Sequence, residues 1–395
     1  MCQTLGAGNG SEITVLAAET FSPEPNLLEC KFADCLAQHS TNNDAAGHPS
    51  RESVNKINRV TRWIIGQSAL AGIISGGLIG GAEIWMRQAI LVGMEGAGWR
   101  ETLPYWAAFY AFAGVISAVE IALLYALALR GVARISQWSG LSLSEHDGRG
   151  LFAHALARTA LEFPNPQVEI YGIDPYARVA NWKLTALNIA YKMKVGVSSF
   201  LVRVFLRRVA SRVAIRGVVP LLAGPLYAAW NAYITWRILT EAQVRTLGPL
   251  AVNNLIAAHF QNAKDLDDTA KDVMLHALAE MVTRGRDAHP NQIYLMARVR
   301  TALERTEEIA LDWPTMRRHL PALRSADQIR VLDVMTLSCI IGSHSHREQM
   351  VLLRSACQDC NVVLHEDRVN ELRRSLRRGD KITVNDLSGA RSDSR

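Results

Sequence analysis

The residue types most common in zinc sites gather near one turn in the last quarter of the chain. His344 and His346 precede a predicted helix over 347–359, and Cys357 and Cys360 lie at its far end. Four ligands, each about 2.0–2.3 Å from one zinc ion, cannot come from both ends of a helix roughly 15 Å long. The two histidines alone could bind a metal weakly, but a capped, solvated turn explains them better. The sequence therefore predicts no metal site and no cofactor.

An acidic residue within an apolar run is a second candidate. Glu120 lies in the middle of the segment 105–129, with no Lys or Arg one helical turn away. Ionisable residues at such positions in membrane proteins are candidates for function. A protonated glutamate that hydrogen-bonds between two helices is the simpler interpretation. Transport that uses Glu120 as an intramembrane acid is the alternative.

A third candidate is a basic stretch, RVFLRRVASRVAIR at 203–216, inside a segment (151–254) that holds 12 Lys and Arg against 4 Asp and Glu. On a helix its arginines face mainly away from its apolar side chains. Such a helix can lie on a membrane, where each basic residue contributes about 1 kcal/mol of attraction to anionic lipid. A solvated face of a core helix is the alternative, and the absence of a nucleic-acid-binding motif argues against nucleic acid. The predicted lipid-binding residues are Arg203, Arg207, Arg208, Arg212 and Arg216.

The common catalytic motifs are missing from the sequence. It contains no Walker loop, no dinucleotide-binding glycine pattern after a strand, no G-x-S-x-G and no H-E-x-x-H. The six cysteines in 395 residues do not form a secreted disulfide scaffold. We therefore expect a non-enzymatic protein.

Two long apolar segments dominate the first part of the chain. Residues 63–86 and 105–129 are each long enough for a helix to cross a hydrocarbon core about 30 Å thick. Seven basic residues flank the pair on the outside, but the loop between the segments holds only Arg87 and Arg100. This asymmetry predicts a two-span hairpin in the cell membrane with both termini in the cytoplasm. A buried hairpin of a soluble helical protein is the alternative, which the length of the two segments disfavours.

The first apolar segment carries a stripe of glycines. Gly72, Gly76 and Gly80 are spaced four residues apart and so share one helix face. Small residues in this pattern let another helix approach closely. The predicted partner is the segment 105–129 or a second copy of the chain.

The run GVVPLLAGPLYAAWNAYITWRILTEAQVRTLGP (217–249) resembles the EcsC-type bacterial membrane-associated proteins. The resemblance covers about 150–250 and depends on an apolar hairpin broken by Pro and Gly, followed by a helix with Asn231 and Arg237. It implies membrane association but little mechanism. For 217–236 a buried or re-entrant hairpin is favoured over a third span.

The C-terminal part contains a repeat with an offset of 57 residues. In each copy an apolar helix leads to a glycine (Gly285, Gly342), a polar loop with a histidine (His289, His346) and a second apolar helix. The second copy resembles the TerB-like helical domain of tellurite-resistance and co-chaperone proteins. In that family an Asp precedes the matching glycine, but Ile341 stands here, so the metal-binding character proposed for the family does not carry over.

These observations combine into an all-α prediction. The expected parts are a disordered tail (1–50), the hairpin (51–150), a basic EcsC-like region (151–254), a TerB-like domain (255–380) and a loose tail (381–395). A helix is also expected to start at Tyr176, behind an Asp-Pro cap. The predicted function is to anchor cytoplasmic helical domains that bind anionic lipid and either a protein partner or a second copy, in an envelope or stress response.

Overall fold

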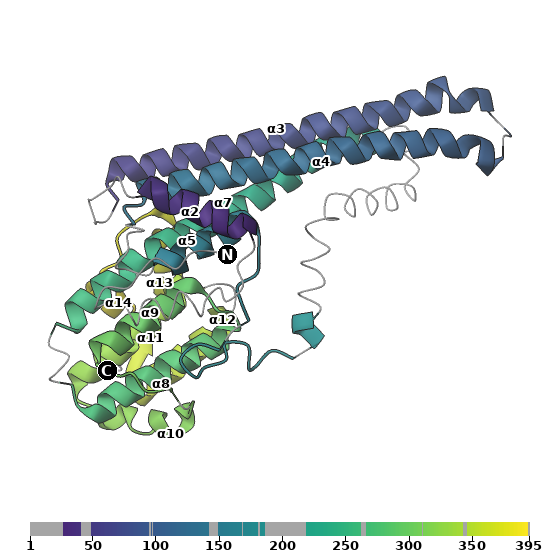
Figure 1. Cartoon of the computed structure of the whole chain (residues 1–395). Helices are drawn as coiled ribbons and strands as arrows, with labels where there is room; N and C mark the ends of the chain where they lie inside the picture. The colour runs from purple at the N-terminus through teal and green to yellow at the C-terminus, as the bar shows by residue number, and fades with distance from the viewer. Residues whose placement is uncertain are drawn as a thin grey trace. The chain divides into compact units, whose positions relative to one another are not determined.

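The computed structural model is mostly helical (Figure 1), and its described residues include two short strands. It describes residues 27–40, 49–94, 96, 98–141, 149–167, 169–180, 182–185, 219–261, 266–309, 311–342 and 346–393. The elements are α2 (Leu27–Ser40), α3 (Arg51–Ala89), η1 (Leu91–Met94), α4 (Trp99–Trp138), α5 (Arg149–Ala160), α7 (Val219–His259), α8 (Asp268–Gly285), α9 (Pro290–Ala302), α10 (Trp313–Arg317), η3 (Leu320–Ala322), α11 (Ser325–Ile341), α12 (His346–Asp359), β1 (Val362–Leu364), α13 (Glu366–Arg378), α14 (Val384–Ser388) and β2 (Arg391–Asp393).

The chain forms two compact units that are interleaved in sequence. Unit 1 comprises Met1–Ile57, Ala133–Lys183 and Thr240–Arg395, and unit 2 comprises Asn58–Val132 and Leu184–Leu239. The unit boundaries therefore fall inside α3, α4 and α7. The predicted boundaries at residues 50, 150 and 254 differ from this division because each long helix contributes to both units.

Unit 2 contains the greater part of α3 and α4. Ile79 and Met86 of α3 pack on Phe109 of α4, and the guanidinium of Arg87 lies 5.3 Å from the ring centroid of Trp106. Both helices are long and apolar enough to cross a membrane. Among the described helices they are the two that meet this criterion, and α7 does not.

Helix α7 differs from the broken hairpin predicted for 217–236. It is one helix of 41 residues that includes Pro220, Pro225 and the Gly248-Pro249 pair. Pro220 lies in the first turn, where the backbone N–H has no partner in a helix anyway. Each later proline removes one backbone hydrogen bond, and packing of the helix offsets this loss. The prediction of a break is wrong for the residues from 219 onward.

The predicted disordered tail contains a helix. In unit 1, α2 packs on α5 through Ala33, Ala153 and Ala157. The buried carboxylate of Glu29 accepts hydrogen bonds from Arg158 Nε at 2.8 Å and pairs with His154 Nδ1 at 3.0 Å. These partners lie more than 120 residues away in sequence, so local composition did not reveal the helix.

The predicted repeat is confirmed by the helix bounds. The pair α8 and α9 recurs as α11 and α12 with an offset of 57 residues, within one residue at the helix starts. Glu304 and Asn361, which follow the second helix of each copy, both adopt the left-handed backbone conformation with φ of 55°. The two copies therefore share the turn after their second helix. The turn between the helices begins differently, because Gly285 is the last residue of α8 whereas Gly342 is extended and lies outside α11.

The two copies exchange glutamine contacts. Gln292 Nε2 donates to the carbonyl of Ser338 at 3.0 Å, and the equivalent Gln349 donates to the carbonyl of the equivalent Met281 at 2.8 Å. A Cβ on Gly342 would lie 2.6 Å from Gln292 Nε2, and one on Gly285 would lie 2.9 Å from Gln349 Nε2. Glycine at these two sequence-matched positions leaves room for the buried glutamines. The repeat is thus a packed, reciprocal pair of helical hairpins.

The C-terminal residues are packed rather than loose. Thr383 and Asp386 form a capping box that starts α14, and β2 pairs antiparallel with β1. Arg391 of β2 forms an ion pair with Asp333, a fully buried residue of α11. The prediction of a loose tail at 381–395 is therefore wrong for 384–393, because a distant buried carboxylate holds this segment.

The helix that was expected to begin at Tyr176 does not begin there. Asp174 accepts the backbone N–H of Tyr176 at 2.8 Å, as a capping residue would. The chain then forms turns over 175–178, and among the described residues between 179 and 190 only 182–185 are helical. The Asp-Pro signal therefore marks a turn.

Candidate functional site

The glycine stripe packs on α7. A Cβ on Gly72 would lie 2.6 Å from the carbonyl carbon of Tyr227, and one on Gly76 would lie 2.7 Å from Cα of Gly224. Contacts this short involve backbone atoms and leave no space for any side chain at either glycine. Gly80 is buried as well. Gly72 and Gly76 therefore pack closely on α7 of the same chain, whereas the predicted partner was the segment 105–129 or a second copy of the chain.

The intramembrane acid candidate also faces α7. Asn231 Nδ2 donates to Glu120 Oε1 at 2.7 Å, and each residue is 5% exposed. The amide of Asn231 thus supplies a hydrogen-bond donor to the carboxyl group within the interior of unit 2. This geometry agrees with the simpler prediction, a glutamate hydrogen-bonded between two helices.

A third contact brings α3, α4 and α7 together, at the start of the apolar segment 63–86 and just after the end of the apolar segment 105–129. A Cβ on Gly131 would lie 2.5 Å from Leu239 Cδ2 and 3.0 Å from Ile64 Cδ1. Three helices therefore meet at one level, and the small residue on α4 makes room for side chains from the other two.

Two groups of predicted site residues cannot be compared with the structure. The predicted lipid-binding residues Arg203, Arg207, Arg208, Arg212 and Arg216 lie outside the described residues. His344 also lies outside them, and only the backbone of His346 is described. Among the described residues there is no group of three or more His, Cys, Asp or Glu side chains that could hold a metal ion.

Of the cysteines near the His344–His346 turn, Cys339 and Cys357 are buried and Cys360 is half-buried. Burial raises the pKa of the Cys357 thiol to about 12 and that of Cys360 to about 11, and it raises the pKa of Cys339 as well. Nucleophilic attack requires a thiolate, so thiols with a raised pKa are weak nucleophiles at neutral pH.

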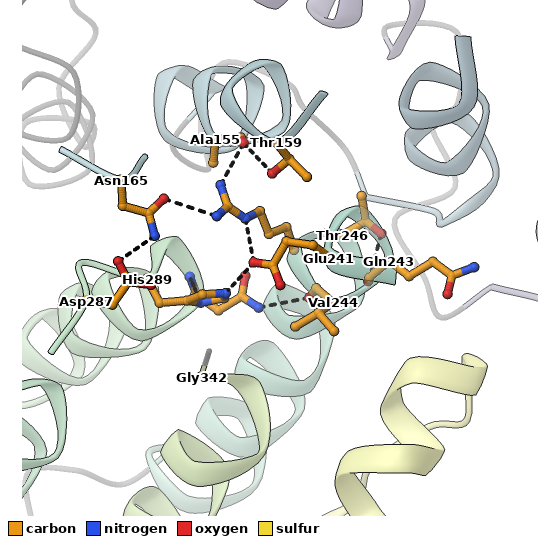
Figure 2. Close-up of polar contacts among 12 residues, drawn as sticks. Ala155, Thr159, Asn165, Glu241, Gln243, Val244, Thr246, Asp287, His289 and Gly342 are labelled. Carbon is orange, nitrogen blue, oxygen red and sulfur yellow. Dashed lines mark hydrogen bonds and ion pairs between the residues drawn. The ribbon is translucent and has the colours of Figure 1, made fainter. Parts of the chain in front are cut away.

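Unit 1 contains a largely buried polar network that the sequence did not reveal, formed by Asn165, Glu241, Arg245, Asp287 and His289 (Figure 2). Arg245 lies at its centre. Its Nε donates to Glu241 Oε1 at 2.9 Å, its Nη2 to Asn165 Oδ1 at 3.1 Å and its Nη1 to the carbonyl of Ala155 at 2.8 Å. One guanidinium therefore joins α7, α5 and the segment that follows α5.

His289 completes the network from the α8–α9 turn. Its Nδ1 accepts the backbone N–H of Asn291 at 3.3 Å, as the N-cap of α9, which leaves Nε2 to donate to Glu241 Oε1 at 3.1 Å. Burial alone would raise the pKa of Glu241, but the charge of Arg245 and the hydrogen bond from His289 lower the pKa well below its usual value. Glu241 is therefore ionised at neutral pH.

The other side of the network reaches Tyr176. Asn165 Nδ2 donates to Asp287 Oδ1 at 2.8 Å, and the Tyr176 hydroxyl donates to the same oxygen at 3.3 Å. Burial and the neighbouring Asp287 raise the pKa of Tyr176 far above its usual value, so its hydroxyl stays protonated. Each group holds its neighbours in place, which points to a structural role for the network.

The same pairing recurs at four acids of unit 1 that the structure describes as buried. Each of these carboxylates contacts two basic side chains, which offsets the cost of burying the negative charge. The groups are Glu29 with His154 and Arg158, Glu280 with Arg178 and Arg284, Asp327 with Arg324 and Arg330, and Asp333 with His259 and Arg391.

The lowered pKa of Glu241 predicts an acid-dependent stability. Its usual value is 4.5, so the stabilisation is complete above about pH 4.5 and is lost as the pH falls towards the folded-state pKa. Glu241→Gln should lower the free energy of unfolding at pH 6, and the difference from wild type should shrink as the pH falls to about 3. Urea unfolding followed by circular dichroism measures this. A difference that does not change with pH would contradict the assignment, and Glu348→Gln, in an exposed pair with Arg286, is the matched control.

One sequence signal could have indicated this network. Glu241 and Arg245 are spaced i, i+4 on a mainly apolar helix whose one other Lys, Arg, Asp or Glu is Arg237, and charged residues in such a helix are buried only in pairs. Comparisons with protein-family models, with curated proteins and with solved structures found no match to this chain, so the EcsC-like and TerB-like resemblances stay predictions.

Proposed function

We propose that the protein is a non-enzymatic integral membrane protein in which unit 2 anchors the helical unit 1 at the cytoplasmic face. One observation carries the proposal: large apolar side chains cover the exposed faces of α3 and α4. A soluble protein rarely exposes so many of them together. They are Leu70, Ile73, Ile74 and Leu78 on α3, and Tyr110, Phe112, Val115, Val119 and Leu123 on α4.

The dimensions of this surface support the same proposal. Trp63 and Trp85, exposed by 60% and 64%, border the apolar face of α3. They are 22 residues apart in the sequence, or about 33 Å along a helix, close to the roughly 30 Å of a hydrocarbon core. Tryptophan prefers the membrane interface, so the two residues mark the expected boundaries of the bilayer.

Orientation and partners extend the proposal. The excess of basic residues outside the hairpin favours cytoplasmic termini. The arginines of 203–216 are the proposed contacts with anionic lipid, and unit 1 is the proposed binding unit for a protein partner or a second copy. An envelope or stress response fits both the EcsC-like and the TerB-like resemblance.

The alternative is a transporter or transport accessory that uses Glu120. The hydrogen bond from Asn231 is the observation that bears on it, because it places a titratable group between α4 and α7. Proton transfer through Glu120 would require the carboxyl group to gain and lose its proton. Anchoring requires only that the hydrogen bond persists.

Glu120→Gln separates the two functions. The glutamine oxygen can still accept from Asn231, so we expect the full-length variant to stay in membranes after an alkaline wash, as wild type should. We also expect proteoliposomes of wild type and variant to show the same proton flux with an entrapped pH-sensitive dye.

Release of the wild-type protein by the alkaline wash would contradict the anchor. A proton flux present in wild type and lost in Glu120→Gln would favour the transporter. Glu120→Leu, which removes the acceptor, is the control for assembly, because it should loosen α4 from α7.

A further inference from the structure

Helix α7 takes part in unit 2 over a long stretch. Gly224 lies against Gly76 of α3, Tyr227 against Gly72, and Leu239 at the level of Ile64. The order of contacts shows that α7 runs antiparallel to α3. From Leu239 to Gly224 it follows α3 for 15 residues, or about 22 Å.

The contacts of α7 with α4 place α7 beside the same apolar stretch as its contacts with α3 do. Asn231 of α7 contacts Glu120 of α4. Leu239, eight residues further along α7, contacts Gly131, which is eleven residues further along α4. Glu120 lies inside the apolar segment of α4, and Gly131 lies two residues beyond its end. A helix held this way against the interior of two membrane spans must share their depth.

The opposite face of α7 is apolar and exposed. Tyr233 and Trp236 are exposed by 48% and 49%, and no Asp, Glu, Lys or Arg occurs between Val219 and Trp236. The first charge of the helix is the exposed Arg237. The exposed face is completed by Pro225, Leu226 and Ala229.

The end of this apolar face coincides with the end of the α3 span. Ile64 of α3 and Leu239 of α7 lie at the same level. Just before Ile64 in the sequence are Arg62 and Trp63, and just before Leu239 are Trp236 and Arg237. All four side chains are exposed. A tryptophan beside an arginine is typical of a helix where it leaves the hydrocarbon for the headgroups.

We propose that α7 from Gly224 to Trp236 is a third membrane helix, with its exposed face in contact with the acyl chains of the bilayer. The inference depends on the proposed membrane anchor. Hydropathy does not detect α7 because Pro220, Pro225 and Asn231 lower the average over its apolar part. The close contacts of Gly72 and Gly76 with α7 are what support its place beside α3. Asn231 is tolerated because it is buried against Glu120 and not exposed to lipid.

Three exposed alanines provide a matched test: Ala122 on α4, Ala229 on the apolar face of α7, and Ala258 near the end of α7 in unit 1. Each is changed to cysteine in the full chain, with native cysteines replaced and the circular dichroism unchanged, then spin-labelled in lipid bilayers. Collision with oxygen, which concentrates in hydrocarbon, is compared with collision with a water-soluble nickel chelate. We expect Ala122→Cys and Ala229→Cys to favour oxygen at least fivefold over Ala258→Cys.

Each other result has a distinct meaning. A label at 229 that behaves like the label at 258, while the label at 122 favours oxygen, would overturn the third helix and leave the anchor intact. Low collision with both reagents at 229 would mean that protein covers this face and would also overturn the inference. A label at 122 that favours the nickel chelate would contradict the membrane anchor itself.

Discussion

Gly76→Leu should destabilise unit 2 by about 3 kcal/mol, because the added side chain would have to occupy space filled by the backbone of α7. The Cβ alone would lie 2.7 Å from Cα of Gly224 and 2.9 Å from the ring of Tyr227. Neither a backbone atom nor a buried ring can move without separating the helices. We therefore expect α3 and α7 to move apart and their shared contacts to weaken together.

Tryptophan fluorescence during unfolding by SDS in mixed micelles measures this effect. Six of the nine tryptophans lie in unit 2, so the signal reports mainly on it: Trp63, Trp85, Trp99, Trp106, Trp230 and Trp236. Gly77→Leu is the matched control, because Gly77 is exposed and a Cβ there meets nothing within 4 Å. Equal stability of the two variants would mean that the glycine stripe does not set the approach of α7.

Arg245→Met should destabilise unit 1 by about 3 kcal/mol, at the lower end of the range for breaking a buried ion pair. The substitution leaves Glu241 with His289 as its remaining partner in the network and removes the donors to Asn165 and Ala155. The Glu241 side chain is 26% exposed, so water offsets part of the loss. Methionine keeps much of the length and the apolar contacts of the arginine stem.

The buried thiols of Cys339 and Cys357 provide a native reporter for this unit. Their rate of reaction with a thiol reagent at increasing urea measures the free energy of opening in the full chain. Arg286→Met is the control, since Arg286 and Glu348 form an exposed pair that contributes at most about 1 kcal/mol. If the thiols of both variants reacted at the same rate, the network would contribute no more to the free energy of opening than a surface ion pair does.

Local signals in the sequence were sufficient for the helical architecture. The two long apolar segments and the 57-residue repeat depend on composition and periodicity within short windows, and each corresponds to helices in the structure. The glycine stripe was recognisable for the same reason. Its partner was not, because Pro225 suggested a break in the segment that forms α7.

Features that depend on distant partners could not be predicted. The helix α2 is held by Arg158, and the C-terminal segment is held by Asp333. The network around Arg245 joins residues up to 122 positions apart in sequence. Residue spacing along the chain does not predict such contacts, because these groups become buried only when the distant segments pack together.

The sidedness of two single cysteines tests the membrane anchor most directly. Gly98→Cys lies in the exposed connection between α3 and α4, and Ala258→Cys lies in unit 1. With a membrane-impermeant thiol reagent on intact cells, Gly98→Cys should be labelled at once, whereas Ala258→Cys should be labelled only after the membrane is made permeable. Labelling of both sites in intact cells, or of neither until the membrane is opened, would contradict a chain whose hairpin crosses the membrane and whose unit 1 stays in the cytoplasm.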